Sequence, residues 1–213
     1  MRSINKNIYL ICIVFISFIC GFSQQTSLKD TTNKEVSILF IGNSLTYTNN
    51  LPQLVKDLAK KQKIEVAYKM LALPNYSLED HWTNGTAQEL ITKNQYDFVI
   101  VQQGPSSQIK GREMLLEYGE KFQSICKPNN AKLCFLMVWP SLTYYHTFEN
   151  VIKNYSLASK INNAILLPVG LEWKNHFGST NDFQYYGADG FHPSLKGSKE
   201  TAKIIVKHLL LKS

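Results

Sequence analysis

The stretch VSILFIGNS, residues 36–44, is a mostly apolar run that ends in Gly-Asn-Ser. Its length and composition predict a short β-strand over residues 36–41 that is buried on both faces. Gly42 breaks this pattern, so we expect Ser44 at the turn that follows the strand. Ligands of open α/β sheets bind beyond the carboxyl ends of the strands, which makes Ser44 the first candidate for a functional residue.

Apolar runs elsewhere in the sequence predict four further strands, and periodic apolar residues predict helices between them. The strands are expected at 64–71, 96–102, 133–138 and 164–168, and the helices at 51–59, 78–93 with an interruption at 84–85, 114–125, 151–161 and 194–211. Strands that alternate with helices favour a parallel sheet with both faces covered. We therefore predict an α/β protein, a three-layer α/β/α sandwich with a flavodoxin-like parallel five-stranded sheet.

Polar segments follow the predicted strands or precede the last helix. They are residues 42–46, 74–78, 102–106 and 189–193. Because the carboxyl ends of parallel strands lie at one edge of the sheet, we expect all four segments to border one cleft.

Three residues of these segments have the chemistry that acyl transfer needs. Ser44 supplies a hydroxyl, His192 a base that takes its proton, and Asp189 a carboxylate that orients the imidazole. Asp189 and His192 are three residues apart, so one loop can present both, and Gly190 gives that loop backbone freedom. The alternative to these catalytic roles is that each residue is only a turn, capping or structural residue.

Two of the segments resemble conserved blocks of the SGNH (GDSL-like) hydrolases. Residues 38–45, ILFIGNSL, are similar to the strand and G-[DN]-S-[LY] motif that carries the nucleophile, and residues 189–193, DGFHP, are similar to the D-x-x-H-P motif. The resemblance spans nearly the whole chain after its first segment. It implies the SGNH hydrolase fold and ester hydrolysis through an acyl-Ser44 intermediate, without a metal or organic cofactor.

The resemblance also implies an oxyanion hole, for which the two middle blocks depart from the family pattern. Asn75 stands where the family has a glycine whose N–H binds the oxyanion, and it is equally readable as a plain turn residue. Ser106 of Gly104-Pro105-Ser106 stands where the family has an asparagine. The candidate donors are therefore the N–H groups of Ser44 and Asn75 and a group near Gly104, with Ser106 and Gln103 as alternative side-chain donors.

Aromatic residues near these segments are candidates for substrate binding. His81 and Trp82 either line the substrate cleft or form a packed helix face. Trp139, Tyr144 and Tyr145 either stack on sugar rings or close the core beneath a loop.

The first segment has the layout of a secretory signal peptide. Basic Arg2 and Lys6 precede an apolar run from residue 8 to residue 19, and small residues precede a cut before Gln24. We predict a signal peptide over 1–23, an N-terminal extension over 24–35 and the hydrolase domain over 36–213, in a secreted or periplasmic protein. A lipid anchor at Cys20 and a retained N-terminal anchor are alternatives. Nothing later in the sequence resembles a membrane span.

Charge and cysteine content bear on nucleic-acid binding, on disulfide formation and on metal sites. The formal net charge is +7, and removal of Arg2 and Lys6 leaves 21 basic against 16 acidic residues, or +5. The lysines are scattered, which is weak evidence for nucleic-acid binding. Cys126 and Cys134 are expected to be buried thiols, with a disulfide between them as an open alternative, and no Cys/His spacing suggests a metal site.

The resemblance and the signal peptide together imply an exported serine esterase, and because carbohydrate O-acetyl removal is a common role of exported members of that family, we expect a small acyl group, such as acetyl, on a carbohydrate. Its partner is a small-molecule or glycan ester, without nucleic acid or a stable membrane span. The alternatives are a lipase or thioesterase on the same fold and a catalytically silent glycan-binding domain. The oligomeric state is not indicated by the sequence.

Overall fold

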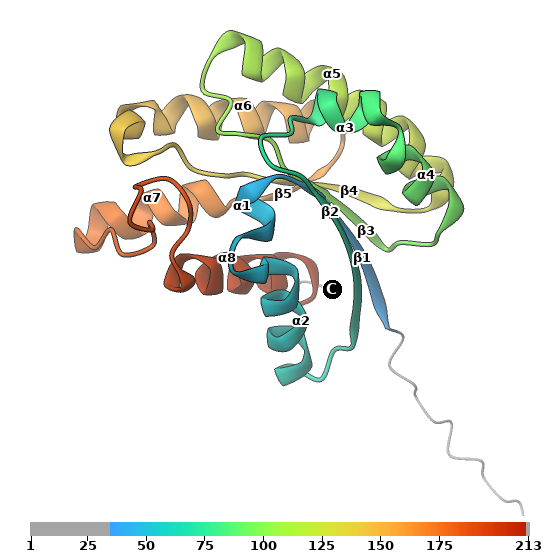
Figure 1. The fold of residues 1–213 in the computed structure, drawn as a ribbon, viewed down its shortest axis with the longest axis horizontal. Coiled ribbons are helices and arrows are strands. Elements are labelled where there is room, and N and C mark those ends of the chain that lie inside the picture. Colours follow the sequence, from blue (N-terminus) through green and yellow to red (C-terminus); the bar gives the residue numbers. More distant parts are fainter. Residues whose placement is uncertain (1–34, 212–213) are drawn as a thin grey trace, which may run out of the picture. The chain divides into compact units, whose positions relative to one another are not determined.

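A computed structural model describes residues 35–211 and shows one five-stranded, fully parallel sheet (Figure 1). The strand order is β2-β1-β3-β4-β5, which is the flavodoxin-like order. The strands are β1 (Val36–Gly42), β2 (Val66–Ala72), β3 (Phe98–Val101), β4 (Lys132–Leu136) and β5 (Ile165–Leu167). The predicted α/β sandwich with five parallel strands is confirmed.

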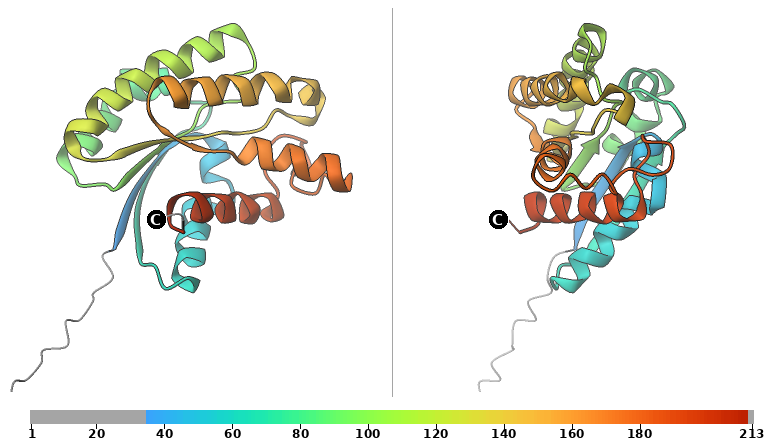
Figure 2. Two further views of the ribbon diagram at one scale, coloured as in Figure 1. Left: turned by 180° about the vertical axis from the view of Figure 1, so that it is seen from behind. Right: turned by 90° about the vertical axis from the view of Figure 1, so that its left-hand side faces the viewer.

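Helices cover both faces of this sheet, as the two further views show (Figure 2). One face carries α2 and α8, which pack against each other, and the other carries α3, α4, α5 and α6. The bounds are α1 (Ser44–Tyr47), α2 (Leu51–Lys61), α3 (Leu78–Asn84), α4 (Thr86–Lys93), α5 (Ile109–Cys126), α6 (Phe148–Ile161), α7 (Val169–Thr180) and α8 (Leu195–Leu209). The expected interruption at 84–85 is the junction of α3 and α4, where Gly85 has a φ of +86°.

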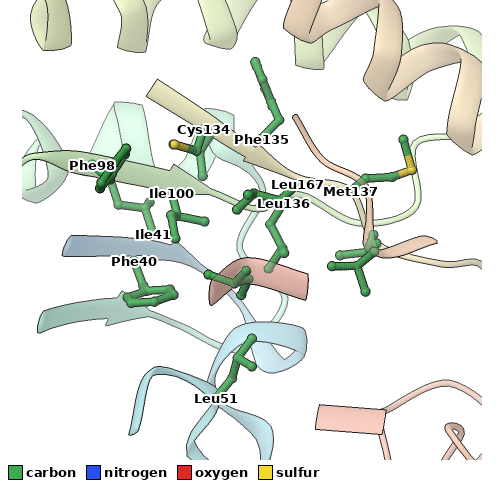
Figure 3. Packing of buried hydrophobic residues seen from close by; sticks show 14 of the residues in the cluster. Phe40, Ile41, Leu51, Phe98, Ile100, Cys134, Phe135, Leu136, Met137 and Leu167 are labelled. Atoms are coloured by element: carbon green, nitrogen blue, oxygen red, sulfur yellow. The ribbon is translucent and has the colours of Figure 1, made fainter. Parts of the chain in front are cut away.

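The core lies on both sides of the three central strands (Figure 3). Residues 38–41 of β1 are completely buried, because β2 and β3 flank the strand and helices cover both of its faces. Phe40 contacts the ring of Tyr68 edge-to-face, with ring centroids 6.3 Å apart. Truncating a large side chain of this kind to alanine costs about 3–5 kcal/mol. The strand that precedes Ser44 is therefore a rigid support.

Two helical segments differ from the sequence-based prediction. Helix α7 was not predicted, although Val169, Trp173 and Phe177 are buried at a spacing of four residues. Glycines at 170 and 178 weaken the local helical signal, and packing of these apolar side chains overrides it. Helix α5 begins at Ile109, five residues before the first apolar residue of the predicted stripe.

Cys126 and Cys134 are both buried free thiols. Burial raises the pKa of Cys126 to about 12, so the thiol is protonated and unreactive at neutral pH. Within residues 35–211, no helix has both the length and the apolar content needed to cross a bilayer. The predicted signal peptide and almost all of the extension lie outside the described residues.

Candidate active site

Ser44 is the first residue of α1, and only Asn43 separates it from the end of β1. Asn43 shapes this turn: its side chain accepts a hydrogen bond from the N–H of Leu45 at 3.1 Å and donates one to the carbonyl oxygen of Tyr76 at 3.0 Å. A Cβ atom at position 42 would clash with the side chains of Thr46 and Gln102, so only glycine fits there. Gly42 and Asn43 thus shape the turn that presents Ser44.

Gln102 fastens this turn to the neighbouring strand and is completely buried. Its Oε1 accepts hydrogen bonds from the N–H of Asn43 at 2.9 Å and from the hydroxyl of Thr46 at 2.8 Å. Its Nε2 donates to the carbonyl oxygen of Gln103 at 2.7 Å. Gln102 belongs to the third polar segment, and no role was predicted for it. The signal that could have identified it is a polar residue directly after a fully buried strand.

A single loop holds Asp189 and His192 together. The Oδ1 atom of Asp189 accepts the N–H groups of Phe191 at 3.0 Å and His192 at 2.9 Å, and its Oδ2 atom lies 2.6 Å from Nδ1 of His192. Gly190 adopts a φ of +68°, which confirms the expected need for backbone freedom. The hydrogen bond from His192, followed by that from the Phe191 N–H, lowers the pKa of Asp189, so the carboxylate is ionised at neutral pH.

The two ends of the described chain meet at the triad. The Nε2 atom of His192 lies 2.9 Å from Oγ of Ser44, a contact that joins residues 148 positions apart. If Nδ1 carries the proton and donates it to the ionised Asp189, Nε2 is free to accept the hydroxyl proton of Ser44. The structure brings together the three residues that the sequence singled out, in the order that proton transfer requires. Their catalytic roles stay a prediction.

The predicted backbone donors border the same cavity as Ser44. This cavity has a volume of about 330 Å³, and Ser44, Asn75 and Gly104 line it. Within residues 35–211, none of their three N–H groups has a protein acceptor. Asn75 adopts a φ of +60°, a conformation that glycine adopts freely and that asparagine tolerates. Three residues with unpartnered N–H groups thus line one cavity, and such groups can bind a developing oxyanion.

The two proposed side-chain donors are occupied by other contacts. The hydroxyl of Ser106 donates to the carbonyl oxygen of Gly104 at 2.9 Å. The Nε2 atom of Gln103 donates to Oγ of Ser106 at 2.9 Å and to the carbonyl oxygen of Gly111 at 3.2 Å. The expectation that either side chain donates to the oxyanion is thereby corrected: both instead fix the loop that carries the Gly104 N–H.

His81 and Trp82 lie outside the cavity that contains Ser44, which corrects the expectation that they line the cleft. His81 is 1% exposed, and its Nε2 lies 2.8 Å from the carbonyl oxygen of Gly42. Burial lowers the pKa of His81, only partly opposed by that hydrogen bond. Trp82 packs edge-to-face on Phe122. His81 therefore supports the turn before Ser44, and Trp82 belongs to the packed helix face that was the alternative.

The aromatic residues after β4 divide between core and cavity. Trp139 is 1% exposed and stacks on Trp173, with ring centroids 3.6 Å apart. Its Nε1 donates to the carbonyl oxygen of Phe191 at 2.9 Å, so this buried ring anchors the loop of His192. Tyr145 packs against Phe148, whereas Tyr144 is 61% exposed and lines a larger cavity of about 770 Å³.

Residues 35–211 contain no group of three or more His, Cys, Asp and Glu side chains placed to hold a metal ion.

Neither models of protein families nor characterised proteins match the sequence. Solved structures match the fold: a candidate SGNH hydrolase from Slackia heliotrinireducens aligns with a TM-score of 0.70 at 21% identity, over 82% of this chain and 99% of that one. The chain has the SGNH hydrolase fold. A lipase/acylhydrolase from Enterococcus faecalis aligns with a TM-score of 0.65 at 17% identity, over 81% of this chain and 94% of that one.

A variant of an acetyl xylan esterase from Geobacillus stearothermophilus aligns with a TM-score of 0.64 at 14% identity, over 84% of this chain and 96% of that one. The SGNH hydrolase fold thus accounts for nearly the full length of each neighbour. At these identities the likeness establishes the fold, and the contacts around Ser44 must carry any statement about chemistry.

Proposed function

We propose that the chain is an exported serine esterase that releases a small acyl group, such as acetyl, from a carbohydrate through an acyl-Ser44 intermediate. The observation that carries this proposal is the continuous hydrogen-bonded series from Asp189 through His192 to Ser44, with contacts of 2.6 Å and 2.9 Å. A nucleophile, a base within reach of it and a group that orients the base are the parts that acyl transfer requires.

In the first half of the reaction, Nε2 of His192 takes the hydroxyl proton as Oγ of Ser44 bonds to the ester carbonyl carbon. The carbonyl oxygen becomes an oxyanion, which we propose is bound by the N–H groups of Ser44, Asn75 and Gly104; their lining of the same cavity supports this. The carbon–oxygen bond to the alcohol then breaks, and His192 returns its proton to the leaving oxygen. Asp189 stays ionised and stabilises the imidazolium.

In the second half, water attacks the acyl-Ser44 carbonyl carbon while His192 takes a proton from the water. Collapse of this intermediate breaks the bond to Oγ, which receives the proton back from His192. The carboxylic acid leaves, and the triad returns to its starting state. Each N–H donor of such a hole contributes a factor of about 10²–10³ to the rate.

Acetyl on a carbohydrate is the substrate class that the cleft favours. The larger cavity beside the triad is lined mainly by hydroxyl, amide, proline and aromatic side chains, a mixture that suits the hydroxyl groups and flat faces of a sugar residue. An acetyl xylan esterase among the proteins of this fold supports the proposal by analogy.

Acetate release tests the catalytic part of this proposal. We expect residues 24–213 to release acetate from acetylated xylan and to hydrolyse p-nitrophenyl acetate, and we expect Ser44→Ala to lose both activities. If wild type and Ser44→Ala are equally inert while acetylated xylan still binds, the chain is a glycan-binding domain and the esterase proposal fails.

Export is tested separately by the mass of the protein recovered outside the cytoplasm. A chain that begins at Gln24 supports a cleaved signal peptide, whereas a lipid-modified chain that begins at Cys20 shows an anchor. Cys20→Ala is the matched control, because it leaves the cut before Gln24 intact and removes the lipid attachment site.

A further inference from the structure

Two cavities of unequal size lie on either side of Phe191. The smaller one, about 330 Å³, contains Ser44, and the larger one, about 770 Å³, is lined by Asp189. Phe191 lines both of them. Its backbone is fixed, because its N–H donates to Asp189 and its carbonyl oxygen accepts from Trp139. The side chain thus extends from an anchored backbone, and the residue borders both spaces.

The direction of proton transfer decides which part of an ester enters which cavity. The alcohol oxygen must receive its proton from Nε2 of His192, so the alcohol leaves on the side of the loop that carries the imidazole. Asp189 and Phe191 of that loop line the larger cavity. The acyl group stays bonded to Ser44 and lies beside the N–H groups that bind its oxygen, which line the smaller cavity.

The linings of the two cavities suit these two parts. The smaller cavity adds apolar surface from Leu45 and Met114 to the polar groups of the reacting centre. The larger cavity is lined by hydroxyl and amide groups together with two prolines, Phe191 and Tyr144, a residue that is 61% exposed. An exposed aromatic ring beside hydroxyl and amide groups presents a flat apolar face on which a sugar ring can lie.

Charge further narrows the class of alcohol. Asp189 is the one charged residue among those that line the larger cavity, and both of its carboxylate oxygens already accept hydrogen bonds. No cationic side chain in this lining can hold a phosphate or a carboxylate of the alcohol. An uncharged alcohol is favoured over an anionic one.

We propose that Phe191 divides the site into a small acyl subsite bounded by Met114 and a large alcohol subsite in which Tyr144 binds an uncharged sugar residue. This inference rests on the proposed ester hydrolysis. It assigns specificity for the acyl group and for the alcohol to different residues, so the two specificities can be changed independently.

The experiment follows acetate or acid release from two substrate series. In the alcohol series, acetylated xylooligosaccharide is compared with ethyl acetate, which has the same acyl group and an alcohol too small to reach Tyr144. In the acyl series, ethyl hexanoate is compared with ethyl acetate, which has the same alcohol. The variants are Tyr144→Ala, with Tyr144→Phe as the variant that keeps the ring, and Met114→Ala.

We expect Tyr144→Ala to raise the ratio of the oligosaccharide KM to the ethyl acetate KM by about tenfold, the upper range for loss of one aromatic contact. Tyr144→Phe restores most of this ratio. We expect Met114→Ala to raise kcat/KM for ethyl hexanoate relative to ethyl acetate without changing the alcohol ratio. Ile161→Ala is the matched control, because Ile161 is also 61% exposed and lies outside both cavities.

The division is wrong if Tyr144→Ala gives the same alcohol ratio as Ile161→Ala, or if Met114→Ala changes the alcohol ratio and Tyr144→Ala the acyl ratio. Tyr144 is exposed, so its truncation leaves the core filled and the variant folded. Failure of the proposed function gives a different result, since no ester of either series would then be hydrolysed faster by wild type than by Ser44→Ala.

Discussion

Replacing Asp189 by asparagine tests whether the triad works through the tautomer of His192. In the wild type, Oδ2 of Asp189 lies 2.6 Å from Nδ1 of His192, and Oδ1 accepts the N–H groups of Phe191 and His192. In Asp189→Asn, the amide oxygen can keep those two N–H contacts, and the amide nitrogen then faces Nδ1. Since that nitrogen is a donor, it favours the ring with Nδ1 unprotonated and Nε2 protonated. Such a ring cannot accept the hydroxyl proton of Ser44.

The expected fall in kcat for Asp189→Asn is about 10³–10⁴-fold, the size seen when a triad carboxylate becomes an amide. This corresponds to about 4–5 kcal/mol of transition-state stabilisation. The side chain of Asp189 is 52% exposed, so the substitution should change the melting temperature little. The assay is kcat for p-nitrophenyl acetate at neutral pH, with the melting temperature as the control for folding.

Asp189→Ala is the informative comparison. Alanine removes the carboxylate and leaves His192 free to choose its tautomer, so its activity should be no lower than that of Asp189→Asn. An asparagine variant that keeps more than about a tenth of the wild-type kcat, or that clearly exceeds the alanine variant, would refute the tautomer argument. Asp189 would then act mainly by holding the backbone of its loop.

Three further predictions concern the supports of the site. Gln102→Leu leaves the N–H of Asn43 and the hydroxyl of Thr46 buried without a partner. Each unpartnered group should lower the free energy of unfolding by about 1–3 kcal/mol. A urea midpoint equal to that of the wild type would contradict this. Asn75→Gly keeps the N–H and the φ of +60°, so kcat should stay within about threefold of wild type, whereas a fall of about 10² would show that the side chain itself donates. Burial lowers the pKa of His81 below 6.5, so the unfolded chain binds a proton before the folded chain does, and the free energy of unfolding falls as the pH drops below 6.5. Between about pH 7.5 and about pH 5, His81→Gln should therefore lose less unfolding free energy than the wild type, as measured by urea unfolding.

The fold could be predicted because its strands are local and strongly patterned. Residues 38–41 and 98–101 are continuous apolar runs, and such runs identify strands that are buried on both faces. Helix α7 was missed although Val169, Trp173 and Phe177 stand at helical spacing, because the glycines at 170 and 178 weaken the local helical signal. Its stability comes from contacts with the aromatic rings of other segments, such as Trp139, which no local pattern reveals.

The triad could be predicted for a different reason, namely that its chemistry restricts which residue types can serve. The backbone donors carry no signal of their own, and Ser44, Asn75 and Gly104 were proposed only through the resemblance to the family's blocks. Ser106 and Gln103 looked suitable by type, and only the coordinates show that their donors are directed at Gly104 and Gly111. Likewise, the sequence shows two aromatic residues five positions apart, and it does not reveal that Trp139 is buried while Tyr144 is exposed.

The distance between His192 and Ser44 depends on anchors outside the loop that carries the imidazole. Asp189 and His192 are both substantially exposed, and exposed loops are the segments that open at low free-energy cost. Two contacts from elsewhere oppose this: Trp139 donates to the carbonyl oxygen of Phe191, and Asn49 donates to that of Pro193 at 3.0 Å. One anchor, the buried Trp139, comes from the segment after β4, and the other, the exposed Asn49, comes from the segment between α1 and α2. The parallel sheet thus fixes the geometry of the triad indirectly, by holding the residues that hold the loop.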